Sequence, residues 1–386
     1  MSTFGGKIEE IPEISVDRFD GDNLNSQAFF LSHCHTDHMR GLFAHHFQEK
    51  IKNEKKFIYV SPVSRAILNG MCPNISGLLK ELSIEFSTSI LVNNKSISVT
   101  CIPAGHCPGS VMFLFEVSDC RILYTGDYRI GTSDISKFKC FYDSFNNVKS
   151  IDKIYLDTTF FLKNFESLPK REDSMMEISK IILNWTSQSP DNAVRIDTKA
   201  RYGYEYAFKE IYERCKMPVH VNNENFKFYS LIPELDKAVT QDGASTQIHC
   251  CYYRDKDICP FISPNNLRTI KISAFRWRDY NFKDGLSVAN EKCNYYYVCY
   301  STHASYEEGL ALIDFLKPKA IQACVEHEDP AVNEAMMKLI KEKIVNVTEK
   351  ILLNAPKLFN VDSGTIYTRP KKILKSDWSV LDSPPR

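Results

Sequence analysis

The stretch Leu31-Ser32-His33-Cys34-His35-Thr36-Asp37-His38-Met39-Arg40-Gly41 contains three histidines and an aspartate within six positions. It directly follows the apolar run Ala28-Phe29-Phe30, which is typical of a buried strand that ends in a polar loop. His33 and His35 alternate as the residues of a strand end do, so we expect them to point the same way. Converging imidazoles and a carboxylate are typical zinc ligands. The stretch therefore indicates a site for one or two metal ions; the alternative is a polar loop.

The composition describes a globular protein of ordinary type. The 386 residues are 43% hydrophobic and 25% charged, which suits two or three domain-sized units. The net charge is zero, so any basic groove for nucleic acid must be local. Residues 1–7 lack the apolar stretch of a signal peptide and no apolar run approaches a membrane span, so we expect no membrane association. The thirteen cysteines are scattered and odd in number, which favours a reduced intracellular compartment.

Ligand-type residues also follow four other predicted strands. Their positions are Asp17 after residues 14–16, His106 after 96–103, Asp127 after 121–125 and Asp157 after 151–156. A lone aspartate at such a place is also an ordinary turn or cap residue, and Asp17 suits equally a turn and a carboxylate that orients a ligand histidine. Repetition at successive strand ends favours a shared site.

The second half of the chain shows strands, polar loops and helices in alternation. From residue 193 to residue 221 this alternation predicts a parallel α/β module. Residues 294–300 then form an aromatic strand that leads to His303, and Ser305 and Glu308 form a capping box that begins a helix. His303 thus occupies a strand-to-helix loop, the same setting as the earlier histidines.

These motifs carry a family resemblance. The order H-x-H-x-D-H, Gly-His and Thr-Gly-Asp, each after a strand, resembles the metallo-β-lactamase fold. Asp157-Thr158-Thr159 and Ser301-x-His303 are similar to motifs of its β-CASP branch, whose members cut nucleic acids. Near-identical runs at residues 14–20, 29–38, 104–115, 156–160 and 199–206 make the chain similar to the DNA-repair nucleases of that branch.

The resemblance implies an α/β architecture, an αβ/βα sandwich with an inserted β-CASP α/β domain. The expected parts are residues 1–156 for the first part of the lactamase domain, 157–302 for the insert, 303–360 for the returning part and 361–386 for a flexible tail. It also implies the metal ligands. One zinc would be held by His33, His35 and His106, and a second by Asp37, His38 and His303, with Asp127 between them. Asp17 and Asp157 would support them, and the catalytic set would be Asp17, Asp37, Asp127, Asp157 and His303. Magnesium or manganese is the alternative to zinc at this active site.

A second metal site is expected in the insert. His249, Cys251 and Cys259 form a loose zinc pattern, in which Cys250 competes with Cys251 and ordinary thiols are the alternative. The resemblance to one member of the branch implies a structural zinc held by His220, His249, Cys251 and Cys259.

Paired metal ions that share a carboxylate suit phosphodiester hydrolysis. Candidate phosphate contacts are Thr158, Thr159, Lys199 and Arg201, for which a strand cap and a solvated loop are the alternatives. The run Phe275-Arg276-Trp277-Arg278 mixes aromatic and cationic residues in a way that suits unpaired bases, and core plus surface is the alternative there.

The resemblance implies a DNA nuclease that opens hairpins, trims overhangs and acts as a 5′ exonuclease in double-strand-break repair by non-homologous end joining, in the nucleus. Val325 occupies the position where RNA-cleaving members have histidine, while the nearby His327 keeps an RNA-processing nuclease as the alternative. An inactive nucleic-acid-binding scaffold is a second alternative, which the filled ligand positions disfavour. DNA-dependent protein kinase and the end-joining ligase are implied partners. We expect the chain to lack the long tail through which the family engages them, so these partnerships stay open.

Overall fold

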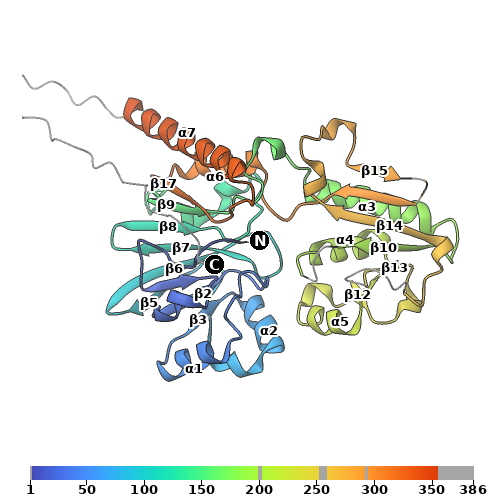
Figure 1. Ribbon diagram of the computed structural model, residues 1–386, viewed down its shortest axis with the longest axis horizontal. Helices are drawn as coiled ribbons and strands as arrows, with labels where there is room; N and C mark the ends of the chain where they lie inside the picture. Colours follow the sequence, from blue (N-terminus) through green and yellow to red (C-terminus); the bar gives the residue numbers. More distant parts are fainter. Residues whose placement is uncertain (1, 199–201, 252–258, 291, 293, 355–386) are drawn as a thin grey trace, which may run out of the picture.

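The computed structural model describes residues 2–198, 202–251, 259–290, 292 and 294–354, with side chains described up to residue 344. Two sheets form the half of the molecule drawn in blue and teal in Figure 1. The first is parallel, in the order β1 (Ile14–Val16), β2 (Ala28–Leu31), β3 (Ile58–Val60) and β4 (Leu79–Glu81). The second has the order β17 (Ala320–Ala323), β9 (Lys153–Leu156), β8 (Cys120–Tyr124), β7 (Val111–Val117), β6 (Lys95–Pro103) and β5 (Ser87–Val92).

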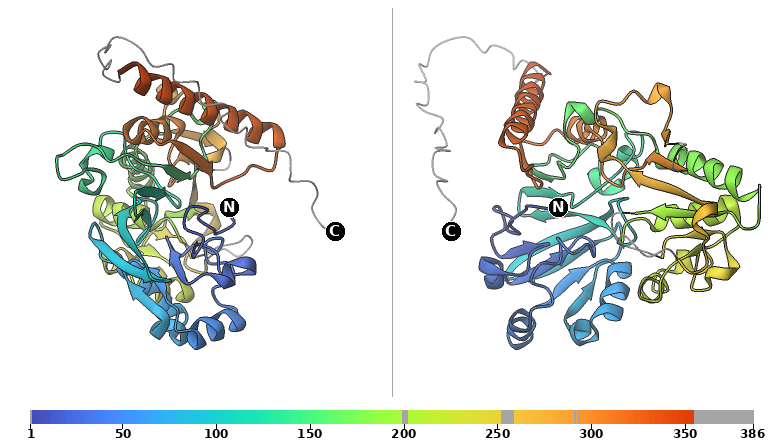
Figure 2. Two further views of the ribbon diagram at one scale, coloured as in Figure 1. Left: turned by 90° about the vertical axis from the view of Figure 1, so that its left-hand side faces the viewer. Right: turned by 45° about the vertical axis from the view of Figure 1, so that its right-hand side comes forward.

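The two sheets pack face to face. Phe30 on β2 contacts Phe113 and Phe115 on β7, with ring centroids 5.4 and 5.0 Å apart, in a shared apolar core. The outer faces are covered by α1 (His45–Asn53) and α2 (Pro62–Met71) on one side and by α6 (Tyr306–Leu316) and α7 (Pro330–Asn354) on the other. Figure 2 shows α7 on the outside of the molecule, away from the four-stranded sheet. The layers are therefore helix, sheet, sheet and helix.

A third sheet forms the other half, drawn in green to orange in Figure 1. Its order is β12 (Val239–Thr240), β11 (Val219–His220), β13 (Ile248–His249), β10 (Ala193–Asp197), β14 (Leu267–Ser273), β16 (Tyr295–Cys299) and β15 (Ser287–Asn290). All pairs are parallel except β15 with β16. The helices α3 (Arg171–Thr186), α4 (Glu205–Cys215) and α5 (Asn223–Tyr229) accompany it, which confirms the predicted parallel α/β module.

The chain leaves the six-stranded sheet after β9 and returns to it at β17, which pairs with β9 in parallel. The capping box of Ser305 and Glu308 at the start of α6 is present as predicted. None of the helices in the described part of the chain combines the length and apolarity that a membrane span requires.

Candidate metal centre

The ends of β1, β2, β6, β8 and β9 meet at one edge of the two packed sheets, where they bring the predicted ligand residues together. Asp17 follows β1, the histidine-rich loop follows β2, His106 follows β6, Asp127 follows β8 and Asp157 follows β9. His303 reaches the same edge from the loop between β16 and α6.

Asp17 is buried beneath the histidine-rich loop, where it accepts several hydrogen bonds. Its backbone adopts φ +56°, a left-handed conformation that is uncommon for a residue other than glycine. Its carboxylate accepts hydrogen bonds from the Ser32 amide and hydroxyl, from the Tyr124 hydroxyl at 2.8 Å and from His38 Nδ1 at 2.8 Å. Asp17 therefore contacts a candidate ligand histidine rather than forming a simple turn.

His33, His35 and His106 each direct one unprotonated ring nitrogen toward the same point. His106 Nδ1 donates to the Thr302 carbonyl, and His35 Nε2 donates to the Tyr202 carbonyl, each at 2.9 Å. The Ser32 hydroxyl gives its proton to Asp17, so His33 Nδ1 donates to that hydroxyl. Burial lowers the pKa of all three imidazoles, so each is neutral and its second nitrogen carries a lone pair.

The resulting arrangement fits a bound cation. His35 Nδ1 lies 2.9 Å from His33 Nε2 and 3.0 Å from His106 Nε2, and none of these nitrogens has a proton to donate. Lone pairs this close repel one another unless a positive ion lies among them. These three residues therefore fit a metal site of the kind that zinc forms with imidazole nitrogens.

A second group of donors lies beside the first. Asp157 accepts from His303 Nδ1 at 2.9 Å, and Asp17 accepts from His38 Nδ1, so both histidines turn Nε2 toward Asp127. His38 Nε2 is buried without a hydrogen-bond partner and lies 3.3 Å from Asp127 Oδ1 and 3.9 Å from Asp37 Oδ2. An orphaned buried nitrogen between two carboxylates also fits a bound cation.

Asp127 faces both groups. Its Oδ2 lies 3.6 Å from His106 Nε2, 3.7 Å from His33 Nε2 and 3.9 Å from His303 Nε2. Burial alone would raise the pKa of Asp127, but His38 and His303 outweigh burial and hold it well below its ordinary value. For His38 and His303, burial would lower the pKa, yet the facing carboxylates raise it. Asp127 is thus an ionised carboxylate placed to be shared by two cations.

The candidate metal centre is partly open to solvent. The side chains of Asp37 and His303 are 24% and 22% exposed and His35 is partly exposed, whereas those of His33, His38 and His106 are at most 1% exposed. A substrate can therefore reach the second group of donors through Asp37 and His303. The backbone amide of Ser2 donates to Asp37 Oδ2 at 2.8 Å and fixes this carboxylate at the rim of the opening.

Several known proteins are similar to this chain. Residues 233–329 match the family described as "DNA repair metallo-beta-lactamase". The chain is 35% identical over 339 residues to "Protein artemis" of Gallus gallus and of Homo sapiens, covering 82% of this chain and 47% and 48% of those proteins. It is 26% identical over 307 residues to "5' exonuclease Apollo" of Rattus norvegicus, covering 78% of this chain and 51% of that protein.

This chain is similar to DNA repair metallo-beta-lactamases. The expected α/β fold is confirmed by this similarity and by the observed sheets, and the similarity implies metal ions. The chain spans about half the length of the curated relatives it matches.

The four residues of the second predicted metal site, in the insert, also lie close together. His220 and His249 are register neighbours on β11 and β13, with their Nδ1 atoms 3.0 Å apart, and Cys259 Sγ lies 3.6 and 3.7 Å from those atoms. Cys251 completes a buried group whose ligand atoms all lie within 4.8 Å of one another. Cys250 turns to Thr198 Oγ1 instead, which resolves the competition between the two cysteines. Burial lowers the pKa of His249 to about 4, so its imidazole is neutral and able to bind a metal.

The two threonines proposed as phosphate contacts have other partners. Thr158 is fully buried, and its hydroxyl donates to the Val325 carbonyl and accepts from the Val325 amide, so its assignment to phosphate was wrong. The Thr159 hydroxyl donates to Asp157 Oδ1 at 2.7 Å and so helps to hold the carboxylate that contacts His303. Lys199 and Arg201 lie outside the described residues.

Several functional contacts had no signal in the sequence. The carbonyls of Tyr202 and Thr302 fix two ligand histidines, but a backbone carbonyl is present at every residue. Ser32 and Tyr124 contact Asp17, and of these only Ser32, next to His33, could have been suspected. Cys107 Sγ lies within 4.8 Å of the ligand atoms of three histidines, although burial raises its thiol pKa well above the ordinary value.

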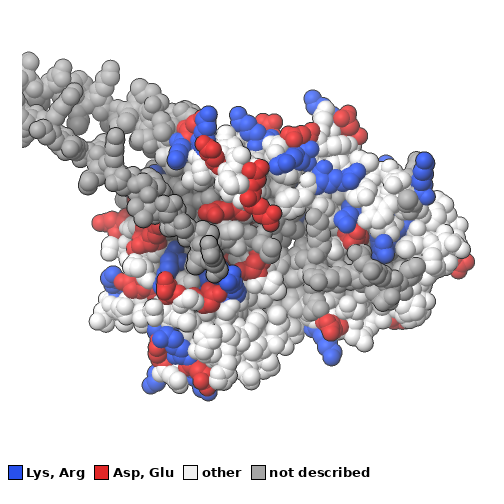
Figure 3. All heavy atoms as spheres, viewed as in Figure 1, with Lys and Arg blue, Asp and Glu red and all other residues white. Residues whose placement is uncertain are grey.

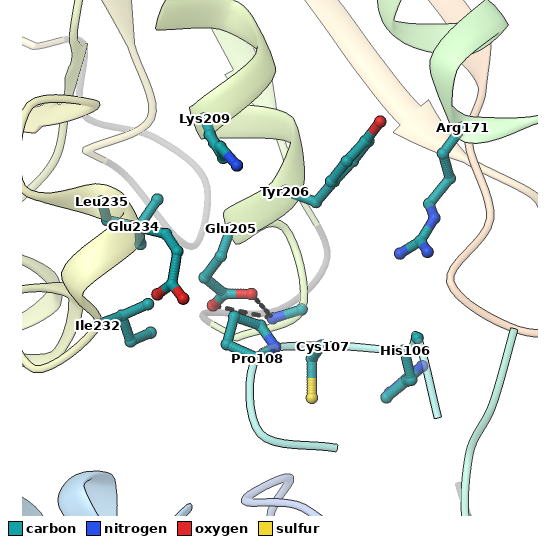
Figure 4. Close-up of a pocket in the computed structure, with 12 residues that line it drawn as sticks. His106, Cys107, Pro108, Arg171, Glu205, Tyr206, Lys209, Ile232, Glu234 and Leu235 are labelled. Atoms are coloured by element: carbon teal, nitrogen blue, oxygen red, sulfur yellow. Dashed lines mark hydrogen bonds between the residues drawn. The ribbon is translucent and has the colours of Figure 1, made fainter. Parts of the chain in front are cut away.

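A cavity of about 240 Å³ lies between the two halves, next to His106. Figure 4 shows Lys209, Tyr206 and Glu205 entering it from α4 and Arg171 from α3, opposite the loop of His106. The Arg171 guanidinium lies 5.0 Å from the Tyr206 ring centroid. The cavity thus places two cations beside the metal centre.

Glu205 is buried, and no cation of the described part of the chain forms an ion pair with it. Both of its carboxyl oxygens accept from the amide of Gly203, at 3.1 and 2.8 Å (Figure 4). Gly203 has φ +112°, and a side chain there would approach His35 Nε2 to 3.2 Å, so this position requires glycine. Burial raises the pKa of Glu205 to about 8.

Replacing Glu205 with glutamine should remove a pH-dependent loss of stability. Between the ordinary pKa of 4.5 and about 8, the folded protein keeps the proton that the unfolded chain releases, so its stability falls as pH rises. Relative to wild type, the unfolding free energy of Glu205→Gln should therefore rise by about 1.4 kcal/mol per pH unit across this window. Urea unfolding at pH 5, 7 and 9 measures this. Glu234→Gln is the control, because Glu234 is an exposed carboxylate of the same cavity. Its unfolding free energy should change with pH as that of wild type does. If the unfolding free energy of Glu205→Gln changed with pH as that of wild type does, the raised pKa of Glu205 would be contradicted.

Proposed function

We propose that this chain is a metal-dependent DNA nuclease that hydrolyses phosphodiester bonds at hairpins, overhangs and 5′ ends. The observation that carries the proposal is the position of Asp127 between two groups of histidine nitrogens at an edge open to solvent. The similarity to Artemis and to the 5′ exonuclease Apollo supports DNA as the substrate.

We propose zinc for the first group of donors and for the site in the insert. Three neutral imidazoles, or two imidazoles and two thiols, suit zinc and do not suit magnesium, which prefers oxygen ligands. The second group mixes carboxylates with two imidazoles, so zinc and manganese both suit it, with magnesium as a further alternative.

When bound, a metal pair lowers the pKa of a water molecule and neutralises charge on the phosphate. The residues of the chain prepare the place for this chemistry. Asp17 and Asp157 accept hydrogen bonds from Nδ1 of His38 and His303 and so keep both Nε2 atoms directed at Asp127, where a bound metal would take the place of the Nε2 protons. The exposed edge at Asp37 and His303 admits the phosphodiester. Arg171 and Lys209 are the candidates for contact with the neighbouring phosphates.

The charge on the surface supports local rather than general attraction to DNA. Figure 3 shows basic and acidic side chains interspersed over the face that it presents, in agreement with the net charge of zero. Attraction to the phosphate backbone then depends on the cations near the centre.

Two features favour DNA over RNA. Val325 is buried and its backbone pairs with the Thr158 hydroxyl, so the position that carries histidine in RNA-cleaving members is apolar. His327 is held through its backbone by the Asn333 side chain, and it belongs to none of the potential metal-binding groups among the described residues. Repair of double-strand breaks by end joining in the nucleus, with a DNA-dependent protein kinase and a ligase as partners, is proposed from the similarity to Artemis alone.

Cleavage of a 5′-labelled DNA hairpin beside a matched RNA hairpin tests the proposal. Wild type should cut the DNA hairpin and leave the RNA hairpin intact, and Asp37→Ala with His38→Ala should cut neither, because this variant removes two of the four donors around the second position. Preferential cleavage of RNA would favour the alternative nuclease. Equal DNA cleavage by wild type and variant would contradict the assignment of Asp37 and His38 to the centre that cleaves DNA.

A further inference from the structure

Arg129 is a buried arginine two residues after Asp127. Its side chain is 4% exposed, and its Nε lies 3.3 Å from a carboxylate oxygen of Glu308 on α6. Taking a guanidinium out of water is costly unless its charge is paired and its N–H groups are hydrogen-bonded. The partners of these N–H groups therefore show which parts of the chain Arg129 holds together.

The two terminal nitrogens of Arg129 reach the two places where the chain passes between the halves of the molecule. Nη2 donates to the carbonyls of Leu168 and Pro169, at 3.2 and 2.8 Å, just before α3 begins. Nη1 donates to the carbonyl of Ser301 at 2.9 Å, just after β16 ends. A single buried cation thus connects the segment that enters the insert, the segment that returns from it and the segment after β8.

The returning segment carries the candidate ligand His303. The Ser301 hydroxyl donates to the His303 carbonyl at 2.8 Å and accepts from the His303 amide at 3.2 Å. One residue later, the Ala304 amide donates to the Tyr128 carbonyl at 2.8 Å. The loop from Ser301 to Ala304 is therefore fixed against the residues that directly follow Asp127.

These contacts set the position of His303 relative to Asp127. His303 Nε2 lies 3.9 Å from Asp127 Oδ2, and the two residues reach the centre on different loops, one after β16 and the other after β8. Their separation therefore depends on how these two loops contact each other. Arg129 belongs to one loop and binds the other through Ser301.

We propose that Arg129 is a positioning residue that acts through Ser301 to hold His303 against Asp127, so that the second group of donors retains its metal ion. The planar guanidinium can bind Glu308, Ser301 and the segment before α3 at once, whereas the single nitrogen of a lysine cannot reach all three. Groups that orient a metal ligand commonly change metal affinity or activity by about tenfold or more. The effect of Arg129 on DNA cleavage rests on the proposed nuclease function.

The test measures metal retention in the full chain without DNA. Wild type and variants are dialysed against increasing concentrations of EDTA, and the metal ions per chain are counted by mass spectrometry. Arg129→Lys keeps the charge but not the set of contacts. Ser301→Ala removes the hydroxyl that joins Ser301 to His303 and keeps the carbonyl that Arg129 binds. Arg121→Lys is the matched control, because Arg121 on β8 pairs with Glu116 and is 36% exposed.

We expect Arg129→Lys and Ser301→Ala to lose one metal ion per chain at an EDTA concentration about tenfold lower than wild type. Their kcat for hairpin cleavage should fall by a similar factor with KM for DNA unchanged, and Arg121→Lys should match wild type. A lower melting temperature in Arg129→Lys together with wild-type metal retention would overturn the proposal, because the arginine would then only stabilise the fold.

Two further outcomes are decisive. If Arg129→Lys does not fold, Ser301→Ala carries the test, and wild-type metal retention in that variant would overturn the connection from Arg129 to His303. If wild type retains its metal ions but cuts no DNA, the nuclease function is wrong, while the retention measurement still decides the role of Arg129.

Discussion

Asp127→Asn is expected to lower kcat for DNA cleavage at least about a thousandfold. Asp127 is the carboxylate that faces both groups of donors, with its two oxygens 3.3 to 3.9 Å from four histidine nitrogens. The amide has almost the same shape but no charge, so it cannot balance two cations in a buried site. Losing a shared ligand of a metal pair removes several kcal/mol of transition-state stabilisation, and each 1.36 kcal/mol corresponds to about tenfold in rate.

Three measurements define this result. Metal content per chain should fall, and kcat should fall with it. The melting temperature without added metal should also fall, because His38 and His303 lose the charge of the facing carboxylate. Asp143→Asn is the control, because Asp143 binds only amides of its own exposed loop. A kcat within tenfold of wild type, with both metals retained, would exclude Asp127 as the shared ligand.

The second large effect concerns the site in the insert. Cys251→Ser should release one metal ion per chain and lower the melting temperature by about 10 °C or more, because structural zinc contributes on the order of 10 kcal/mol to small folded units. The expected loss of stability is large because the four candidate ligands connect β11, β13 and the segment at Cys259.

The adjacent cysteine provides a matched control. Cys250 is buried like Cys251, but its thiol lies 3.6 Å from Thr198 Oγ1 and outside the group of four. Cys250→Ser should therefore retain the full metal content. Full metal content in both variants would show that the insert binds no metal through Cys251, whereas metal loss in Cys250→Ser alone would show that the wrong thiol has been assigned.

Strand alternation accounts for what the sequence could predict. His33 and His35, and likewise His249 and Cys251, are separated by two positions and share a face, while Cys250 points the opposite way. Applied to residues 249–251, the same rule would have chosen Cys251 without any structure. The position of each donor at a strand end follows from the pattern of apolar runs.

The errors and omissions come from contacts that are distant in the sequence. The Thr158 hydroxyl could contact a phosphate or a neighbouring backbone, and Val325 decides between them from 167 positions away. The carbonyls of Tyr202 and Thr302 reach histidines 167 and 196 positions away. No local pattern encodes such contacts, because they depend on how segments that are distant in the sequence pack together.

The hydrogen bond from His35 to the Tyr202 carbonyl joins the two halves of the molecule at a candidate metal ligand. A ligand that displaces residues 202–205 therefore changes the orientation of His35 and with it the affinity for metal. Thermodynamic linkage then requires the metal to change the affinity for that ligand by the same factor. Metal loading and occupancy of the cavity beside α4 are consequently two measurements of a single coupling free energy.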